Sequence, residues 1–144
     1  MDSNEYSYQK LRVYTMAKDY VKDVYTLLKK FPREEQYAMC DQLRRAVISV
    51  PSNIVEGMSR SSEKEKSHFI EIAYGSLLES ECQLDIACDL GYISNNELKD
   101  MQDKICEISK MLSGLRSSLN SKLSTLNSQR STLNAQLSTL NSKR

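Results

Sequence analysis

Residues 42–57, QLRRAVISVPSNIVEG, decide the fold class. Apolar side chains recur in this stretch at steps of three and four residues, which is the spacing of one helix face: Leu43, Val47, Val50 and Ile54. Pro51 lies inside the pattern, where a proline removes one backbone hydrogen bond and kinks a helix. The sequence therefore predicts a kinked amphipathic helix that ends near Met58.

The same spacing continues on both sides of this helix. Upstream, residues 11–30 form one amphipathic pattern, and Pro32 is expected to end that helix and open the next, whose apolar face would include Tyr37. Downstream, Ser62-x-x-Glu65 and Ser94-x-x-Glu97 are capping boxes that start a third and a fourth helix. The third helix is expected to stop at Gly91 and to have a wide apolar face that includes the following residues: Phe69, Ile72, Ala73, Leu77, Leu84, Ile86 and Ala87.

Four long helices joined by short links predict an antiparallel four-helix bundle. The chain has 144 residues but only four glycines and two prolines, which argues against a turn-rich β-sandwich or barrel. We expect an all-α protein whose bundle domain covers residues 1–116.

The last part of the chain, residues 117–144, is a low-complexity repeat of four heptapeptides, SSLNSKL, STLNSQR, STLNAQL and STLNSKR. We call this segment the tail. Its seven-residue spacing defines a leucine stripe: Leu119, Leu123, Leu126, Arg130, Leu133, Leu137 and Leu140. The step of four from Leu119 to Leu123 is a stutter where the bundle and the tail join. Two interpretations remain open, a helical extension of the fourth helix and a solvated, partly disordered tail.

Charge and composition exclude several classes of protein. The net charge is +1, but the tail has Lys122, Arg130, Lys143 and Arg144 and no acid, so residues 1–116 carry −3. No apolar run approaches a membrane span, and the first residues lack the order of a signal peptide, so we expect a cytoplasmic protein without membrane contact. The cysteines read as small core thiols: Cys40, Cys82, Cys88 and Cys106.

An enzyme is not expected. His68 is the only histidine and has no nucleophile near it in the sequence, and no phosphate-binding loop or zinc-protease motif occurs. One histidine cannot complete a metal set, so we expect neither a metal nor another cofactor.

Helix faces suggest a polar seam on the second helix. Arg45, Ser49, Asn53 and Glu56 follow one another at steps of four, four and three, so they share a face. One interpretation is a hydrogen-bonded seam that sets helix register or a subunit contact, with Glu56 or Glu79 as the partner of a buried Arg45. The other is a site for a ligand or a phosphate backbone.

Basic side chains cluster near the links between helices. Cations placed in this way are sufficient to contact nucleic-acid phosphates, although charged helix ends are often only solvated surface. The residues that could bind RNA or DNA are these: Lys29, Lys30, Arg33, Arg44, Arg60 and Lys64.

Three stretches, KKFPREEQY (29–37), QLRRAVISVPSNIVEG (42–57) and GSLLESECQL (75–84), together with Arg60, resemble a bacterial family of four-helix bundles. Its members are encoded in intervening sequences of 23S ribosomal RNA genes, and the family is similar to the accessory protein of diversity-generating retroelements. The resemblance implies a homopentameric ring, contact with RNA or DNA, and a reverse transcriptase or another protein as partner. The residues that match the family signature are Arg45, Ser49, Pro51, Asn53, Glu56 and Gly57. Lys66 and the tail depart from the pattern.

The sequence thus supports two functions from different classes. The first is a noncatalytic, oligomeric bundle that acts as a nucleic-acid-binding accessory factor. The alternative is a structural or protein-interaction bundle that binds no nucleic acid.

Overall fold

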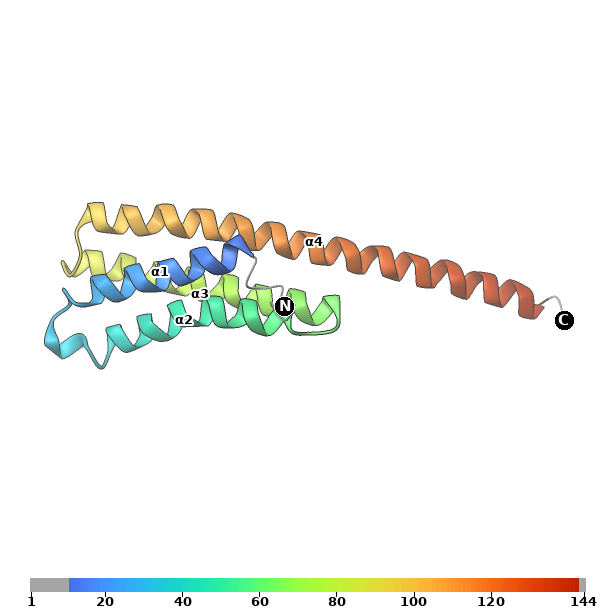
Figure 1. The fold of residues 1–144 in the computed structure, drawn as a ribbon, viewed down its shortest axis with the longest axis horizontal. Helices are drawn as coiled ribbons and strands as arrows, with labels where there is room; N and C mark the ends of the chain where they lie inside the picture. The colour runs from blue at the N-terminus through green and yellow to red at the C-terminus, as the bar shows by residue number, and fades with distance from the viewer. Residues whose placement is uncertain (1–10, 143–144) are drawn as a thin grey trace, which may run out of the picture.

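Four α-helices run antiparallel to their chain neighbours in the computed structural model, which describes residues 11–142 (Figure 1). The helices are α1 (Arg12–Leu28), α2 (Met39–Met58), α3 (Glu63–Asp89) and α4 (Asn95–Ser142), with a short 3₁₀ turn, η2 (Arg33–Glu35), between the first two. No strand occurs between residues 11 and 142. The expected all-α four-helix bundle is confirmed.

The core lies between helices that pack around one axis. α1 contacts α2 and α4, and α3 contacts the same two helices from the other side. The largest side chains with almost no solvent exposure come from all four helices: Tyr20, Leu28, Leu43, Ile54, Ile70, Leu77, Leu84, Ile105, Ile108 and Leu112. Because each such apolar side chain contributes about 1.5–3 kcal/mol when fully buried, this shared core is what holds the helices together.

Both predicted capping boxes begin a helix. At α4 the box is reciprocal, since the N–H of Glu97 donates to Ser94 Oγ at 3.1 Å and the N–H of Ser94 donates to Glu97 Oε1 at 2.9 Å. At α3 the N–H of Glu65 donates to Ser62 Oγ at 3.1 Å. Gly91, with φ of 82°, follows the end of α3, as its predicted role as a stop requires.

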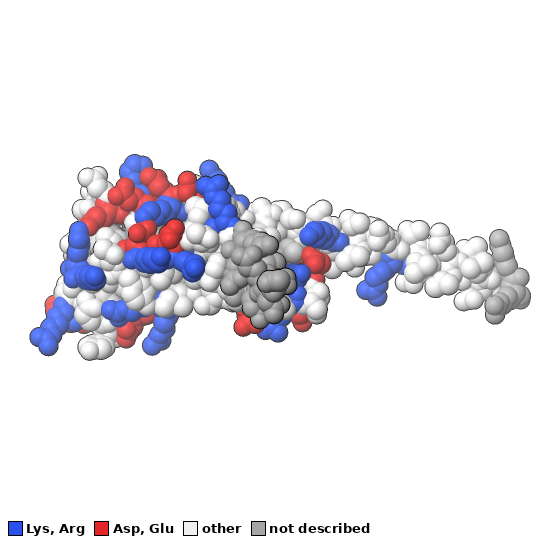
Figure 2. Space-filling model, viewed as in Figure 1, with Lys and Arg blue, Asp and Glu red and all other residues white. Residues whose placement is uncertain are grey.

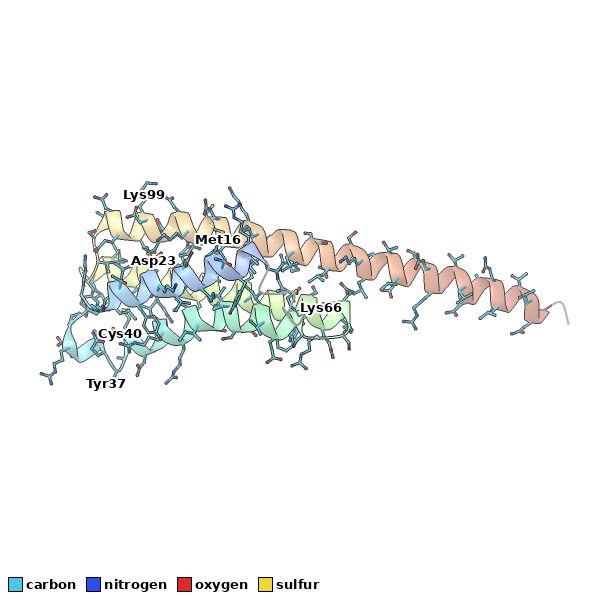
Figure 3. The ribbon with its side chains drawn as sticks, in the orientation of Figure 1. Met16, Asp23, Tyr37, Cys40, Lys66 and Lys99 are labelled. Carbon is cyan, nitrogen blue, oxygen red and sulfur yellow. The ribbon has the colours of Figure 1, made fainter. Side chains whose placement is uncertain are left out.

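The predicted start of the second helix was wrong. Pro32 opens only the 3₁₀ turn, and α2 begins at Met39 because Ala38 departs from helical geometry, with φ −120° and ψ −95°. Tyr37 is consequently not part of the helix: its side chain is 91% exposed and points away from the bundle (Figure 3). From Met39 onward α2 runs without interruption through Pro51 to Met58.

The predicted apolar face of α3 was too wide. Ile72 and Ile86 are 38% and 44% exposed, so they lie outside the core. Polar residues take the inward positions instead, with Ser80 fully buried and Gln83 8% exposed. Two of the four cysteines, Cys82 and Cys106, are also exposed and are not core thiols, whereas Cys40 is buried.

The tail continues α4 as a helix to Ser142, beyond the end of the bundle (Figure 1). The helical extension is therefore the interpretation that holds for the described part of the tail; Lys143 and Arg144 lie outside the described residues. Leu119 is 5% exposed and still belongs to the core, but Leu126, Leu133, Leu137 and Leu140 are 49–62% exposed.

Candidate functional site

The polar seam of α2 forms a hydrogen-bonded contact with α3. Ser49 Oγ lies 2.8 Å from Ser76 Oγ across the two helices. Asn53 donates through Nδ2 to Ser49 Oγ and to the Ser49 carbonyl oxygen, each at 2.8 Å. Because these bonds form only when the two helices are in one register, Ser49 and Asn53 act together as a register contact.

Arg45 is not buried, contrary to the buried pair considered for it. Its side chain is exposed and, among the described residues, makes no ion pair. Arg45 and Glu79 border the same surface hollow of about 320 Å³ between α2 and α3. Glu79 accepts a hydrogen bond from Gln83 Nε2 at 3.3 Å. The hollow thus has a cation and a carboxylate at its rim, both open to solvent.

Glu56 faces a different partner from the one expected. Its Oε2 accepts from Arg60 one helical turn later, at 2.7 Å, and both side chains are about half exposed, 51% and 41%. Arg60 also lies 4.8 Å above the ring of Phe69. An exposed pair of this kind contributes at most about 1 kcal/mol, and it partly neutralises the charge that Arg60 could offer to a phosphate.

The first basic cluster lies at the end of the bundle where α1 gives way to α2. Lys29 and Arg33 are exposed there and make no ion pair within residues 11–142. Lys30 instead binds Glu97 at the start of α4. The hydrogen bond from Lys30, followed by that from the Ser94 backbone, lowers the pKa of the Glu97 carboxyl.

Arg44 serves the connection between α1 and α2 rather than the surface. Its guanidinium donates to the Gln36 carbonyl oxygen at 3.1 Å, to Gln36 Oε1 at 2.9 Å and to Asp41 Oδ1 at 2.9 Å. Gln36 Nε2 in turn donates to the carbonyl oxygen of Leu28 at 3.2 Å. These bonds hold the turn against the ends of α1 and α2, which leaves Arg44 few free donors for a ligand.

The six basic candidates do not form one patch. Lys29, Lys30 and Arg33 lie at one end of α2, whereas Arg60 and the exposed Lys64 lie at the other. The 20 residues of α2 separate the two ends by about 30 Å. Figure 2 shows the same distribution on one face, where basic and acidic side chains alternate over the bundle and few charges occur along the tail.

Sequence reasoning missed the contacts between α1 and α4. Lys104 of α4 binds Asp23 of α1, and this pair lies in a surface hollow of about 380 Å³ that Asp19, Lys22 and Glu107 also line. Met16 and Asp23 lie on the side of α1 that is next to α4 (Figure 3). Helix periodicity places Asp23 beside the apolar face, but it does not tell which helix will be its neighbour.

Residues 11–142 contain no cluster of three or more His, Cys, Asp or Glu side chains that could hold a metal ion. His68 is exposed, with its ring 5.8 Å from that of Phe69. Within the same residues no helix combines the length and apolar content needed to cross a membrane.

Fold and surface together define a class: an antiparallel four-helix bundle with a hydrogen-bonded α2–α3 contact, exposed cations at both ends and a long helical tail. The family model of the 23S rRNA-intervening sequence protein matches residues 9–114, and the chain belongs to this family. Membership of this family, which the sequence motifs indicated, is confirmed. The match ends at residue 114, shortly before the tail begins.

A solved structure shares the fold. It is the crystal structure of a protein of unknown function from the S23 ribosomal protein family of Bacteroides thetaiotaomicron, with a TM-score of 0.67 and 21% sequence identity. The match covers 72% of this chain and 97% of that one. No curated protein matches the sequence.

Proposed function

We propose that this protein is a noncatalytic, homo-oligomeric bundle that acts through its surfaces, and that nucleic acid is bound at its basic ends. The observation that carries the oligomer is an exposed apolar strip on α3. We define the α3 strip by side chains that recur at every fourth residue along α3 and at the residue that caps its C-terminal end: Leu78, Cys82, Ile86 and Leu90. Side chains at this spacing lie on one line along a helix, so the strip forms a single ridge.

The α3 strip is suited to a protein partner. Leu78, Ile86 and Leu90 are 44%, 44% and 55% exposed, and contiguous exposed apolar surface of this kind marks protein–protein contacts. Exposed acidic residues border it: Glu71, Glu79, Asp85 and Asp89. Phosphates are repelled by such a border, so α3 is a place for a protein and not for nucleic acid. The homopentameric ring, and a reverse transcriptase or other protein as a further partner, are the assemblies that the family resemblance implies.

Light scattering of the full chain tests the oligomer. We expect a mass several times that of one chain for the unmodified protein at about 10 µM. The combined change Leu78→Ser and Ile86→Ser should lower the mass while the helix content stays the same, because both side chains are exposed. Asp85→Ser, at the border of the strip, is the matched control and should leave the mass unchanged. A monomeric full chain refutes the oligomer, and a strip variant of unchanged mass refutes the α3 strip as the contact that holds it together.

Binding to nucleic acid depends on those exposed cations that form no ion pair with another described residue. Lys29 and Arg33 meet this condition at one end of the bundle, and Lys64 meets it at the other. Phosphate contacts of this kind weaken as salt rises, with a slope of about −0.7 per contact for single-stranded RNA. The description of the family points to RNA as the first nucleic acid to test.

Salt titration with a labelled single-stranded RNA measures these contacts. The combined change Lys29→Gln and Arg33→Gln should weaken binding and reduce the slope of log K against log salt by about 1.4. Lys99→Gln is the control, since Lys99 is exposed but pairs with Asp103 at 3.8 Å. An unchanged slope in the double variant assigns the binding to other residues, and absence of RNA binding by the full chain leaves the protein-interaction bundle as the function.

A further inference from the structure

The leucine stripe of the tail is buried at Leu119, half-buried at Leu123 and uncovered beyond it. Leu119 is 5% exposed inside the core, whereas Leu126, Leu133, Leu137 and Leu140 are 49–62% exposed on a continuous helix. We propose that this stripe is an antiparallel pairing site for the tail of a second copy of the chain. The proposal does not depend on the α3 strip, because the two surfaces lie on different helices.

The stripe is complementary to itself when two copies run in opposite directions. In one register, Leu123 lies opposite Leu140 of the second copy and Leu126 lies opposite Leu137. In the same register Arg130 lies opposite Leu133, so all six positions from 123 to 140 have a partner. Arg130 can then pack its aliphatic stem on that leucine and extend its guanidinium into solvent, whereas a parallel pair would place the two Arg130 side chains in one layer.

The bundle itself disfavours a parallel pair. Leu119 is buried against the core, and Leu126 lines a hollow together with Glu63 at the start of α3, so the stripe faces the side on which α3 lies. If the two tails were parallel, both bundles would lie at the same end of the pair. Each bundle would then occupy the space beside its own stripe that the other bundle needs, so the two would collide. Antiparallel tails place the two bundles at opposite ends.

Charge and size also fit a second copy, and they predict a weak contact. The positions that flank the stripe are uncharged along most of its length, so two copies do not repel each other there: Asn127, Gln129, Asn134 and Gln136. The stripe from Leu123 to Leu140 is about 27 Å long and roughly 10 Å wide. This is smaller than the roughly 800 Å² per partner of a standard interface, so we expect pairing in the micromolar range.

Sedimentation of the full chain over a range of concentrations tests the pairing. The combined change Leu133→Ala and Leu137→Ala removes two stripe side chains without lowering helix propensity, because alanine is the best helix former. This double variant should lower the mass of the assembly, and the mass should fall to half if each tail pairs with one other tail. The control is Ser128→Ala with Thr132→Ala, on the opposite side of the same turns, which should leave the mass unchanged. An unchanged mass in the leucine variant overturns the proposal.

Distances between spin labels test the direction on an intact stripe. Labels are placed on Ser131→Cys or on Ser138→Cys, seven residues apart on one face, with Cys82, Cys88 and Cys106 changed to serine. In the antiparallel register the two labels of a pair are offset along the axis by about 1.5 Å at position 131 and about 20 Å at position 138. We therefore expect a longer distance at 138. Equal distances at the two positions mean a parallel pair, and absence of any distance means no pair; either result overturns the proposal.

Discussion

A double-mutant cycle on Tyr20 and Ser80 tests how the core treats buried polar groups. Both side chains are fully buried, and Tyr20 Oη lies 2.7 Å from Ser80 Oγ. Ser80 Oγ also donates to the Leu77 carbonyl oxygen at 2.6 Å, so in this pair the tyrosine is the donor and the serine the acceptor. Ser80→Ala leaves the phenol with a buried, unsatisfied O–H, whereas Tyr20→Phe leaves only an unused lone pair on the serine.

The expected free energies of unfolding follow from this asymmetry. Loss of a partner for a buried donor costs about 1–3 kcal/mol, so Ser80→Ala should destabilise the protein by about 2 kcal/mol and Tyr20→Phe by about 1 kcal/mol. The double variant should lose no more than Ser80→Ala alone, because it removes both members of the bond. The coupling energy is then on the order of 1 kcal/mol or more.

Urea unfolding at one protein concentration measures the cycle. Ser109→Ala is a matched control, since Ser109 Oγ donates to the Cys106 carbonyl oxygen at 2.8 Å in the same way as Ser80 does to Leu77, but at an exposed site. We expect this control to change stability by less than about 0.5 kcal/mol. The reasoning is refuted if Ser80→Ala costs no more than Ser109→Ala, or if the two single changes simply add in the double variant.

Three further predictions concern local features of the bundle. Gly57→Ala should destabilise the protein by about 1–3 kcal/mol in thermal melts, because the added Cβ would lie 2.9 Å from Phe69 Cβ and 3.2 Å from the Lys66 carbonyl oxygen. Gly75→Ala is the control, since no atom lies within 4 Å of its added Cβ, and it should stabilise the protein by up to about 1 kcal/mol. Ser94→Ala should cost about 1 kcal/mol in urea unfolding through loss of the α4 cap, and a neutral effect would contradict the reciprocal box. Burial raises the pKa of the Tyr20 phenol, so the unfolded state loses this proton at a lower pH than the folded state, and the free energy of unfolding should fall as pH rises above about 10. Tyr20→Phe should make that fall shallower, and an identical slope in the variant would count against the buried phenol.

Helix existence and helix ends were predictable where the signal was local. The boxes at Ser62 and Ser94 need only residues three positions apart, and both begin a helix. The start of α2 was missed because it depends on side chains that lie further apart in the sequence than the two residues of a capping box. The side chains of Gln36 and Arg44, eight residues apart, hold the connection as a turn and delay the helix to Met39.

The candidate site was less predictable because a shared helix face does not specify partners. Ser49 and Asn53 were placed on one face from spacing alone, but their contact with Ser76 depends on how α2 and α3 are rotated about their axes. The same rotation exposes Arg45, for which a buried pair was one of two interpretations, and Ile86, which periodicity placed on the apolar face. The rotation of each helix about its axis is set by the packing of all four helices, and the apolar pattern of a single helix does not determine it.

The stutter at the junction explains how one helix can serve both the bundle and a second copy. From Leu112 to Leu123 the apolar positions span 11 residues in three turns, or about 3.67 residues per turn, which is close to a straight α-helix. The stripe therefore leaves the bundle on the side by which Leu112 and Leu119 are buried. The surface that packs against α3 inside the bundle thus becomes, beyond it, the surface that is free for another tail.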